Sequence, residues 1–173
     1  FTEPPIIYGN LPYHLSSKII FGLIEHPQAW RRACFMLQKE FAERLAAPTG
    51  TRQSSALSVQ AALWTFTTHA FDVPAKCFHP APKVESSVIA MEKRSEPAAD
   101  VGGLSEFRQV VRALFAQRRK MARKALKSIC ADVESLLSMA ELDGTRRGET
   151  FDFSEIAQLS RAFTQLRVRD SGG

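Results

Sequence analysis

Hydrophobic and polar positions alternate in two different ways along the chain, and the pattern changes near residue 100. Before that point, short apolar runs predict strands over residues 6–8 and 33–38, and further strands are expected over 67–73 and, from alternating positions, over 84–91. Apolar residues at helical spacing between these runs predict helices over 16–26, 39–45 and 58–66. Strands that alternate with helices are typical of an α/β fold, and we expect the last two strands to form an antiparallel hairpin at the sheet edge.

After residue 104 the apolar spacing is only helical. Five apolar residues fall on one face of an amphipathic helix that we expect Ser105 to cap, namely Phe107, Val110, Val111, Leu114 and Phe115. Further helices are expected over 133–140 and from a capping box at Asp152 and Glu155 through residue 163. Residues 95–104 carry proline and glycine without periodicity and are interpreted as a linker. The predicted organisation is an α/β domain over 1–94, this linker, and a small all-helical domain over 105–173.

Composition narrows the class of protein. The chain has 173 residues, of which 45% are apolar, and this suits one domain or two small ones. No apolar stretch reaches the length of a membrane span, and no signal peptide is visible. The three cysteines are widely spaced and odd in number, and the four histidines lack ligand spacing. We therefore expect reduced thiols, a cytoplasmic location and no bound metal.

Positive charge is concentrated in one segment. Residues 117–127 contain six Lys and Arg side chains and no acid, whereas the net charge of the whole chain is only +5. Solvated helix faces usually mix both signs, so a run of one sign favours contact with phosphate groups. The side chains that we expect to bind RNA are Arg118, Arg119, Lys120, Arg123 and Lys124, together with Lys83 of the first domain.

The turn after the first strand is the strongest candidate for chemistry. It reads Asn10-Leu11-Pro12-Tyr13 and follows the apolar run 6–8. The Asn10 side-chain oxygen and a backbone carbonyl near Leu11 can accept both hydrogens of an exocyclic amine, which aims the nitrogen lone pair at an electrophile. Pro12 stiffens the turn because its φ angle is fixed, and Tyr13 offers a ring on which a base can stack. The same residues could equally form a plain strand-to-helix turn with a packed tyrosine.

A second aromatic residue begins a proline-rich segment further along the chain. Residues 78–89 read FHPAPKVESSVI, in which two prolines enforce an extended conformation ahead of an alternating strand. Phe78 is therefore expected on a stiff loop, where its ring can cover the second face of a base that Tyr13 holds. Taken alone, a phenylalanine in this position would more often belong to the core.

Together these segments resemble the bacterial-type ribosomal RNA adenine N6,N6-dimethyltransferase family. The resemblance covers residues 6–163 and rests on four motifs in order: NLPY (10–13), FMLQKEFAERL (35–45), FHPAPKVESSV (78–88) and FAQRRKMARKAL (115–126). It implies the C-terminal half of a Rossmann-like methyltransferase sheet that uses S-adenosylmethionine, followed by a helical RNA-binding domain. The implied reaction is dimethylation of two adjacent adenosines in small-subunit ribosomal RNA by an enzyme that is monomeric when intact.

The resemblance also assigns roles to individual residues. Asn10, Leu11, Pro12 and Tyr13 match the catalytic turn of the family, and Asn10 is also expected to touch the cofactor. Phe78 matches the ring that stacks on the target adenine. Lys39 and Glu40 are expected to shape the rim of the pocket rather than to transfer protons.

One part of the family pattern does not occur in this sequence. The family opens with a strand and a glycine-rich loop that cradles the cofactor, followed by an acidic residue for the ribose. Here the adjacent glycines Gly102 and Gly103 follow a polar stretch, and the sequence begins at Phe1. We therefore expect the C-terminal portion of a longer enzyme that lacks the N-terminal cofactor-binding half. Such a fragment should bind S-adenosylmethionine poorly and should be inactive alone.

Two other classes of protein remain as alternatives. A noncatalytic ribosome-assembly or RNA-binding factor could keep the same fold as a binding surface, and a degraded upstream glycine loop would distinguish it from an enzyme. A DNA amino-methyltransferase is the weaker alternative. Such enzymes usually carry a Pro-Pro-aromatic form of the motif and a large separate recognition domain, and this sequence has neither.

Overall fold

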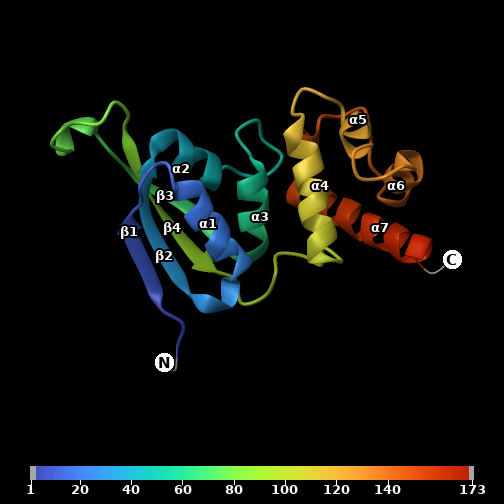
Figure 1. Ribbon diagram of the computed structural model, residues 1–173, viewed down its shortest axis with the longest axis horizontal. Helices are drawn as coiled ribbons and strands as arrows, with labels where there is room; N and C mark the ends of the chain where they lie inside the picture. Colours follow the sequence, from blue (N-terminus) through green and yellow to red (C-terminus); the bar gives the residue numbers. More distant parts are fainter. Residues whose placement is uncertain (1–2, 172–173) are drawn as a thin grey trace. The chain divides into compact units, whose positions relative to one another are not determined.

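The computed structural model describes residues 3–171, which divide into two compact units (Figure 1). The first unit contains the residues up to Ala47 together with Ala61–Ala98, and the second contains Pro48–Gln60 and the residues from Ala99 onward. The units are not continuous in sequence, because the segment 48–60 groups with the C-terminal unit. The domain boundaries at 94 and 105 stay a prediction.

The first unit is built on a mixed sheet of four strands in the order β1-β2-β4-β3. β1 (Ile6–Asn10) runs parallel to β2 (Arg32–Gln38), and β2 runs antiparallel to β4 (Ser86–Lys93). β3 (Thr65–Val73) pairs antiparallel with β4 at the edge of the sheet, which confirms the predicted hairpin.

Helices follow the strands and cover one face of the sheet. α1 (Ser16–Glu25) follows β1, and α2 (Lys39–Ala46) follows β2 and packs against β2, β3 and β4. Because strand side chains alternate between faces, one face of the sheet contributes the core residues Ala33, Phe35, Leu37, Ile89 and Met91. Tyr8 of β1 lies on the opposite face of the sheet, and 82% of its surface is exposed. A short 3-10 turn, Pro27–Ala29, lies between α1 and β2.

The helix α3 (Ala56–Trp64) begins and ends two residues earlier than the predicted span 58–66. The Ser55 hydroxyl accepts a hydrogen bond from the Ser58 backbone N–H at 3.1 Å, so Ser55 caps the helix and fixes its start. The helix ends before Thr65 because this residue already pairs with Lys93 in the β3–β4 ladder.

The second unit is helical and contains α4 (Leu104–Ala116), α5 (Ala122–Leu126), α6 (Val133–Met139) and α7 (Phe153–Ser171). The capping box is confirmed, because Asp152 accepts from the Glu155 backbone N–H at 2.9 Å and Glu155 accepts from that of Asp152 at 2.8 Å. α7 runs beyond residue 163, where the predicted helix ended. The Arg167 guanidinium lies over the Phe163 ring and donates to Gln109 of α4, and these contacts stabilise the additional turns.

The segment ahead of α4 is held against α7. The Gly103 backbone N–H donates to the Thr164 hydroxyl at 3.0 Å, and the Ser160 hydroxyl donates to the Val101 carbonyl. Gly102 has a φ of 69°, a left-handed conformation that favours glycine and lets the chain turn into the helix. The helix therefore begins at Leu104 with Gly103 at the cap position, and the expectation that Ser105 caps it is wrong.

Candidate functional site

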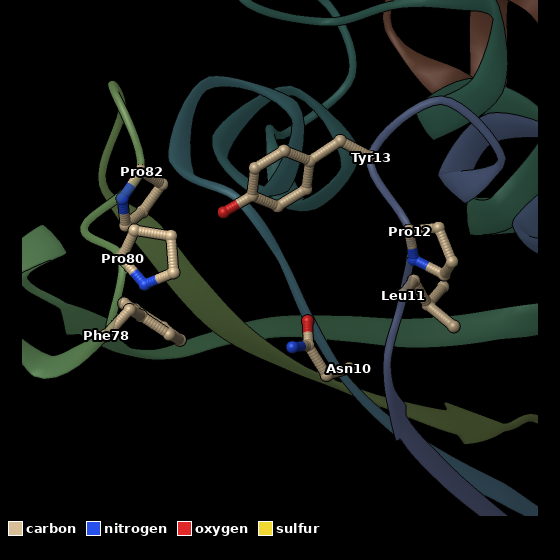
Figure 2. A pocket seen from close by; sticks show the side chains of 7 residues that line it. All are labelled: Asn10, Leu11, Pro12, Tyr13, Phe78, Pro80 and Pro82. Carbon is tan, nitrogen blue, oxygen red and sulfur yellow. The ribbon is translucent and has the colours of Figure 1, made fainter.

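The five residues predicted to be catalytic line a single pocket, which we call the Asn10 pocket. It has a volume of about 330 Å³ and is lined by Asn10, Leu11, Pro12, Tyr13, Phe78, Pro80 and Pro82 (Figure 2). The strand register explains why these distant segments meet. The carboxyl ends of β1 and β2 lie at the same end of the sheet as the loop between β3 and β4, because Gln38 and Val73 both pair with Ser86. Ligand sites of open α/β sheets lie beyond the carboxyl ends of the parallel strands.

Figure 2 shows how the side chains face the pocket. The Asn10 amide projects between Phe78 on one side and Leu11 with Pro12 on the other. The Tyr13 ring lies across the space from Phe78, and its hydroxyl points toward the proline-bearing loop. Asn10 is exposed and Tyr13 is 37% exposed, so both are accessible to a ligand.

The backbone of the turn is fixed on both sides of Leu11. The Leu11 N–H donates to the Met36 carbonyl at 3.1 Å, which continues the β1–β2 pairing by one residue. The Pro12 carbonyl accepts from the Leu15 N–H at 2.9 Å and from the Ser16 hydroxyl at 3.1 Å, and these contacts lead into α1. Since the Pro12 carbonyl is occupied, the acceptors left to bind an amine in this turn are the Asn10 side chain and the Leu11 carbonyl.

A hydrogen bond that was not predicted connects the two walls of the pocket. The hydroxyls of Tyr13 and Ser86 are 2.9 Å apart. Ser86 is the first residue of β4 and is fully buried, so it is a fixed partner directly after the loop that carries Phe78. The two residues are separated by 73 positions, and only the register of the sheet brings them together.

A charged cluster lies at the same end of the sheet. The Lys39 ammonium contacts Asp72 Oδ2 at 2.8 Å and Glu85 Oε2 at 3.0 Å. Asp72 Oδ1 also accepts from the Ser87 hydroxyl at 2.6 Å and lies 2.8 Å from His69 Nε2. Hydrogen bonds from Lys39, Ser87 and His69 hold the pKa of Asp72 well below its ordinary value. Hydrogen bonds to Asp72 and Glu85 raise the pKa of Lys39 well above its ordinary value. Neither Asp72 nor Lys39 is therefore suited to proton transfer near neutral pH.

Lys39 and Glu40 do not line the Asn10 pocket. They line a second hollow of about 320 Å³, whose other lining residues are Gln38, Glu43, Val84 and Glu85. The expectation that these two residues shape the rim of the pocket stays a prediction. Among residues 3–171, no group of three potential metal ligands is close enough to hold an ion, and no helix has the length and apolarity needed to cross a membrane.

The side chains expected to bind RNA differ in their surroundings. Arg119, Lys120 and Lys124 are exposed in the second unit, and Lys83 is exposed in the loop after Pro82. Arg118 is half-buried, with its guanidinium 3.0 Å from Glu149 and 2.6 Å from the Arg52 carbonyl. Arg123 lies 3.1 Å from Glu134. The RNA-binding role of all six stays a prediction, and the contacts of Arg118 indicate a structural function as well.

Comparisons with known proteins identify the family of this chain. A model of the family described as ribosomal RNA adenine dimethylase matches residues 2–162. The ribosomal RNA small subunit methyltransferase A of Magnetococcus marinus is 42% identical over 157 residues, which are 91% of this chain and 56% of that protein. The protein of the same name from Geobacillus thermodenitrificans is 38% identical over 168 residues, which are 93% of this chain and 57% of that protein.

Solved structures show the same fold. A dimethyladenosine transferase from Plasmodium falciparum matches with a TM-score of 0.73 at 22% identity, covering 97% of this chain and 68% of that chain. The 23S rRNA methyltransferase ErmE matches with a TM-score of 0.68 at 23% identity, covering 93% and 66%. The predicted Rossmann-like α/β fold is confirmed, and the chain spans slightly more than half the length of the curated relatives it matches. With most of its residues matched by the family model, the chain belongs to the ribosomal RNA adenine dimethylase family.

Proposed function

We propose that the protein dimethylates the N6 amines of two adjacent adenosines in small-subunit ribosomal RNA. One observation carries this proposal: Asn10 and Phe78, which are distant in sequence, line the same pocket, and the Tyr13 ring lies across the space from Phe78. We expect a flat base to lie between the two rings with its exocyclic amine toward the Asn10 amide. Base stacking on aromatic rings is a general way for proteins to hold an unpaired nucleotide.

The residues of the pocket would act by positioning. The Asn10 side-chain oxygen and the Leu11 carbonyl accept the two N–H groups of the amine, so that its lone pair points away from the ring plane. S-adenosylmethionine supplies the methyl group when bound, and Asn10, exposed at the carboxyl end of β1, is the residue here suited to touch it. No general base is required, because the methylated ammonium loses its proton readily. The pKa shifts of Lys39 and Asp72 agree with this, because they keep both groups charged near neutral pH and unable to accept a proton there.

The helical unit would hold the RNA backbone. Arg119, Lys120 and Lys124 are exposed within one short segment and can neutralise phosphates without specifying sequence. We place the reaction in the cytoplasm, because three widely spaced cysteines, an odd number, favour a reducing compartment.

The test uses the full-length protein and small ribosomal subunits that lack the methyl groups. We expect Asn10→Ala to lower the rate of methyl transfer by about 100-fold, as for loss of one preorganised polar contact. Phe78→Ala should lower it by about 10- to 100-fold through loss of one stacking face. Phe71→Ala is the matched control, because this phenylalanine of β3 is 58% exposed and does not line the Asn10 pocket.

Mass spectrometry of the modified adenosines gives the readout. Near-normal dimethylation by both pocket variants would refute the assigned roles. A wild-type protein that binds the RNA but neither binds S-adenosylmethionine nor transfers methyl groups would instead identify a noncatalytic assembly factor on this fold.

A further inference from the structure

One lysine, Lys39, contacts both ends of the loop that carries Phe78. This Phe78 loop, residues 74–85, connects β3 to β4. Asp72 lies just before it and Glu85 is its last residue, and the Lys39 ammonium contacts both carboxylates at 2.8 and 3.0 Å. The Lys39 backbone N–H also donates to the Glu85 carbonyl at 3.0 Å. One residue of α2 therefore holds both ends of the loop.

The charges at this position make the cation necessary. Asp72 and Glu85 bring two carboxylates to the same ammonium, and like charges so placed repel when no cation separates them. Asp72 is further oriented by the hydroxyl of Ser87, which is fully buried. Isolated surface ion pairs contribute little, but here the ammonium contacts two carboxylates, one of which also accepts from the buried Ser87 hydroxyl. The Lys39 backbone N–H adds a hydrogen bond to the Glu85 carbonyl.

The closed base is also connected to the opposite wall of the Asn10 pocket. Ser86 follows Glu85 directly, and its hydroxyl lies 2.9 Å from that of Tyr13. A shift of the loop base would therefore move Phe78, whereas the buried Ser86 continues to hold Tyr13 in place. The separation of the two rings depends on the same few backbone positions that Lys39 holds.

We propose that Lys39 is a positioning residue for the nucleobase, whose ammonium keeps the ends of the Phe78 loop together so that Phe78 stays opposite Tyr13. This inference rests on the proposed methyl transfer. Lys39 does not touch the base, and its effect passes through Asp72 and Glu85 to the loop. A displacement of about 1 Å at a reacting centre is enough to lower a rate by roughly 100-fold, so a change in the loop base has a measurable effect on the reaction.

The experiment uses the full-length protein with unmethylated small subunits. We expect Lys39→Met to lower kcat for methyl transfer by about tenfold or more while the KM for S-adenosylmethionine stays within about twofold. The double variant Lys39→Met/Glu85→Gln removes the repulsion between the carboxylates and should recover most of the lost kcat. Lys18→Met is the matched control, because this lysine is exposed on α1.

A second readout follows the loop itself. Amide hydrogen exchange over residues 74–85 should accelerate in Lys39→Met, while exchange in β2 and β4 stays at the wild-type rate. Faster exchange throughout the sheet, with no recovery in the double variant, would mean that Lys39 only stabilises the fold, and this overturns the proposal. Wild-type kcat in Lys39→Met overturns it as well. If the wild-type protein itself transfers no methyl groups, the proposed function fails, and the role of Lys39 fails with it.

Discussion

Removing only the hydroxyl of Tyr13 separates the two contributions of this side chain. Its ring faces the Asn10 pocket, and its hydroxyl lies 2.9 Å from that of Ser86. Tyr13→Phe keeps the ring and deletes the hydrogen bond, whereas Tyr13→Ala deletes both. The two variants therefore test stacking and wall-to-wall contact independently.

The expected magnitudes follow from these contacts. A neutral hydrogen bond contributes about 0.5–1.5 kcal/mol. Because Ser86 is fully buried, we expect the loss of its hydrogen bond to Tyr13 to cost an energy near the upper end of this range. Since about 1.4 kcal/mol corresponds to tenfold, Tyr13→Phe should lower kcat/KM by roughly five- to tenfold. Tyr13→Ala also loses a stacking face worth about 1–3 kcal/mol, for a total decrease of roughly 30- to 1,000-fold.

The assay is single-turnover methyl transfer by the full-length protein on unmethylated small subunits. Ser86→Ala removes the same hydrogen bond from the other side, so it completes a double-mutant cycle with Tyr13→Phe. Because the second deletion leaves no buried hydroxyl without a partner, the double variant should be less impaired than the sum of the single variants. If Tyr13→Phe loses as much activity as Tyr13→Ala, the ring does not stack on the substrate and the proposed clamp is wrong.

Three further predictions concern the helical unit. Glu155→Gln should lower the free energy of unfolding by about 1 kcal/mol at pH 7 in urea titrations. The Arg146 hydrogen bond lowers the pKa of Glu155 from 4.5, so this difference from wild type should shrink as the pH falls through the lowered value; an unchanged difference at pH 3 would contradict it. Lys124→Met should lower the slope of the RNA-binding constant against salt concentration, on logarithmic scales, by about one phosphate contact. Arg118→Met should lower this slope less, because Glu149 already pairs with the guanidinium, and should destabilise the unit by about 1–2 kcal/mol. Gly148→Ala places a methyl group 2.7 Å from a neighbouring side chain and should cost about 1–3 kcal/mol on thermal or urea unfolding.

Local rules predicted the elements well where a few neighbouring residues decide the conformation. The Asn-Leu-Pro-Tyr turn ends a strand and precedes a helix, and the capping box at Asp152 starts α7, as the sequence indicates. The start of α4 was missed by two residues because a distant contact decides it. Thr164 of α7 binds the backbone of Gly103, and no pattern within residues 95–105 reveals that partner.

The charge run shows the same limit for the candidate RNA-binding site. The absence of acids within 117–127 favoured contact with phosphates, but Arg118 meets Glu149 and Arg123 meets Glu134. The neutralising acids come from other parts of the helical unit, so local net charge overstates the number of side chains available to phosphates. The exposed residues Arg119, Lys120 and Lys124 are the better candidates for that reason.

The contacts that shape the Asn10 pocket depend on strand register. Tyr13 meets Ser86, and Lys39 meets Asp72 and Glu85, only because Gln38 pairs with Ser86 and Asp72 pairs with Ser87. A slip of β4 by one residue would exchange the faces of the strand and turn the Ser86 hydroxyl away from Tyr13. The buried core residues of β2 and β4 oppose such a slip, since it would also expose them. The hydrophobic pattern of the sheet therefore sets the register that brings the two rings to one pocket, and Lys39 can hold the Phe78 loop only in this register.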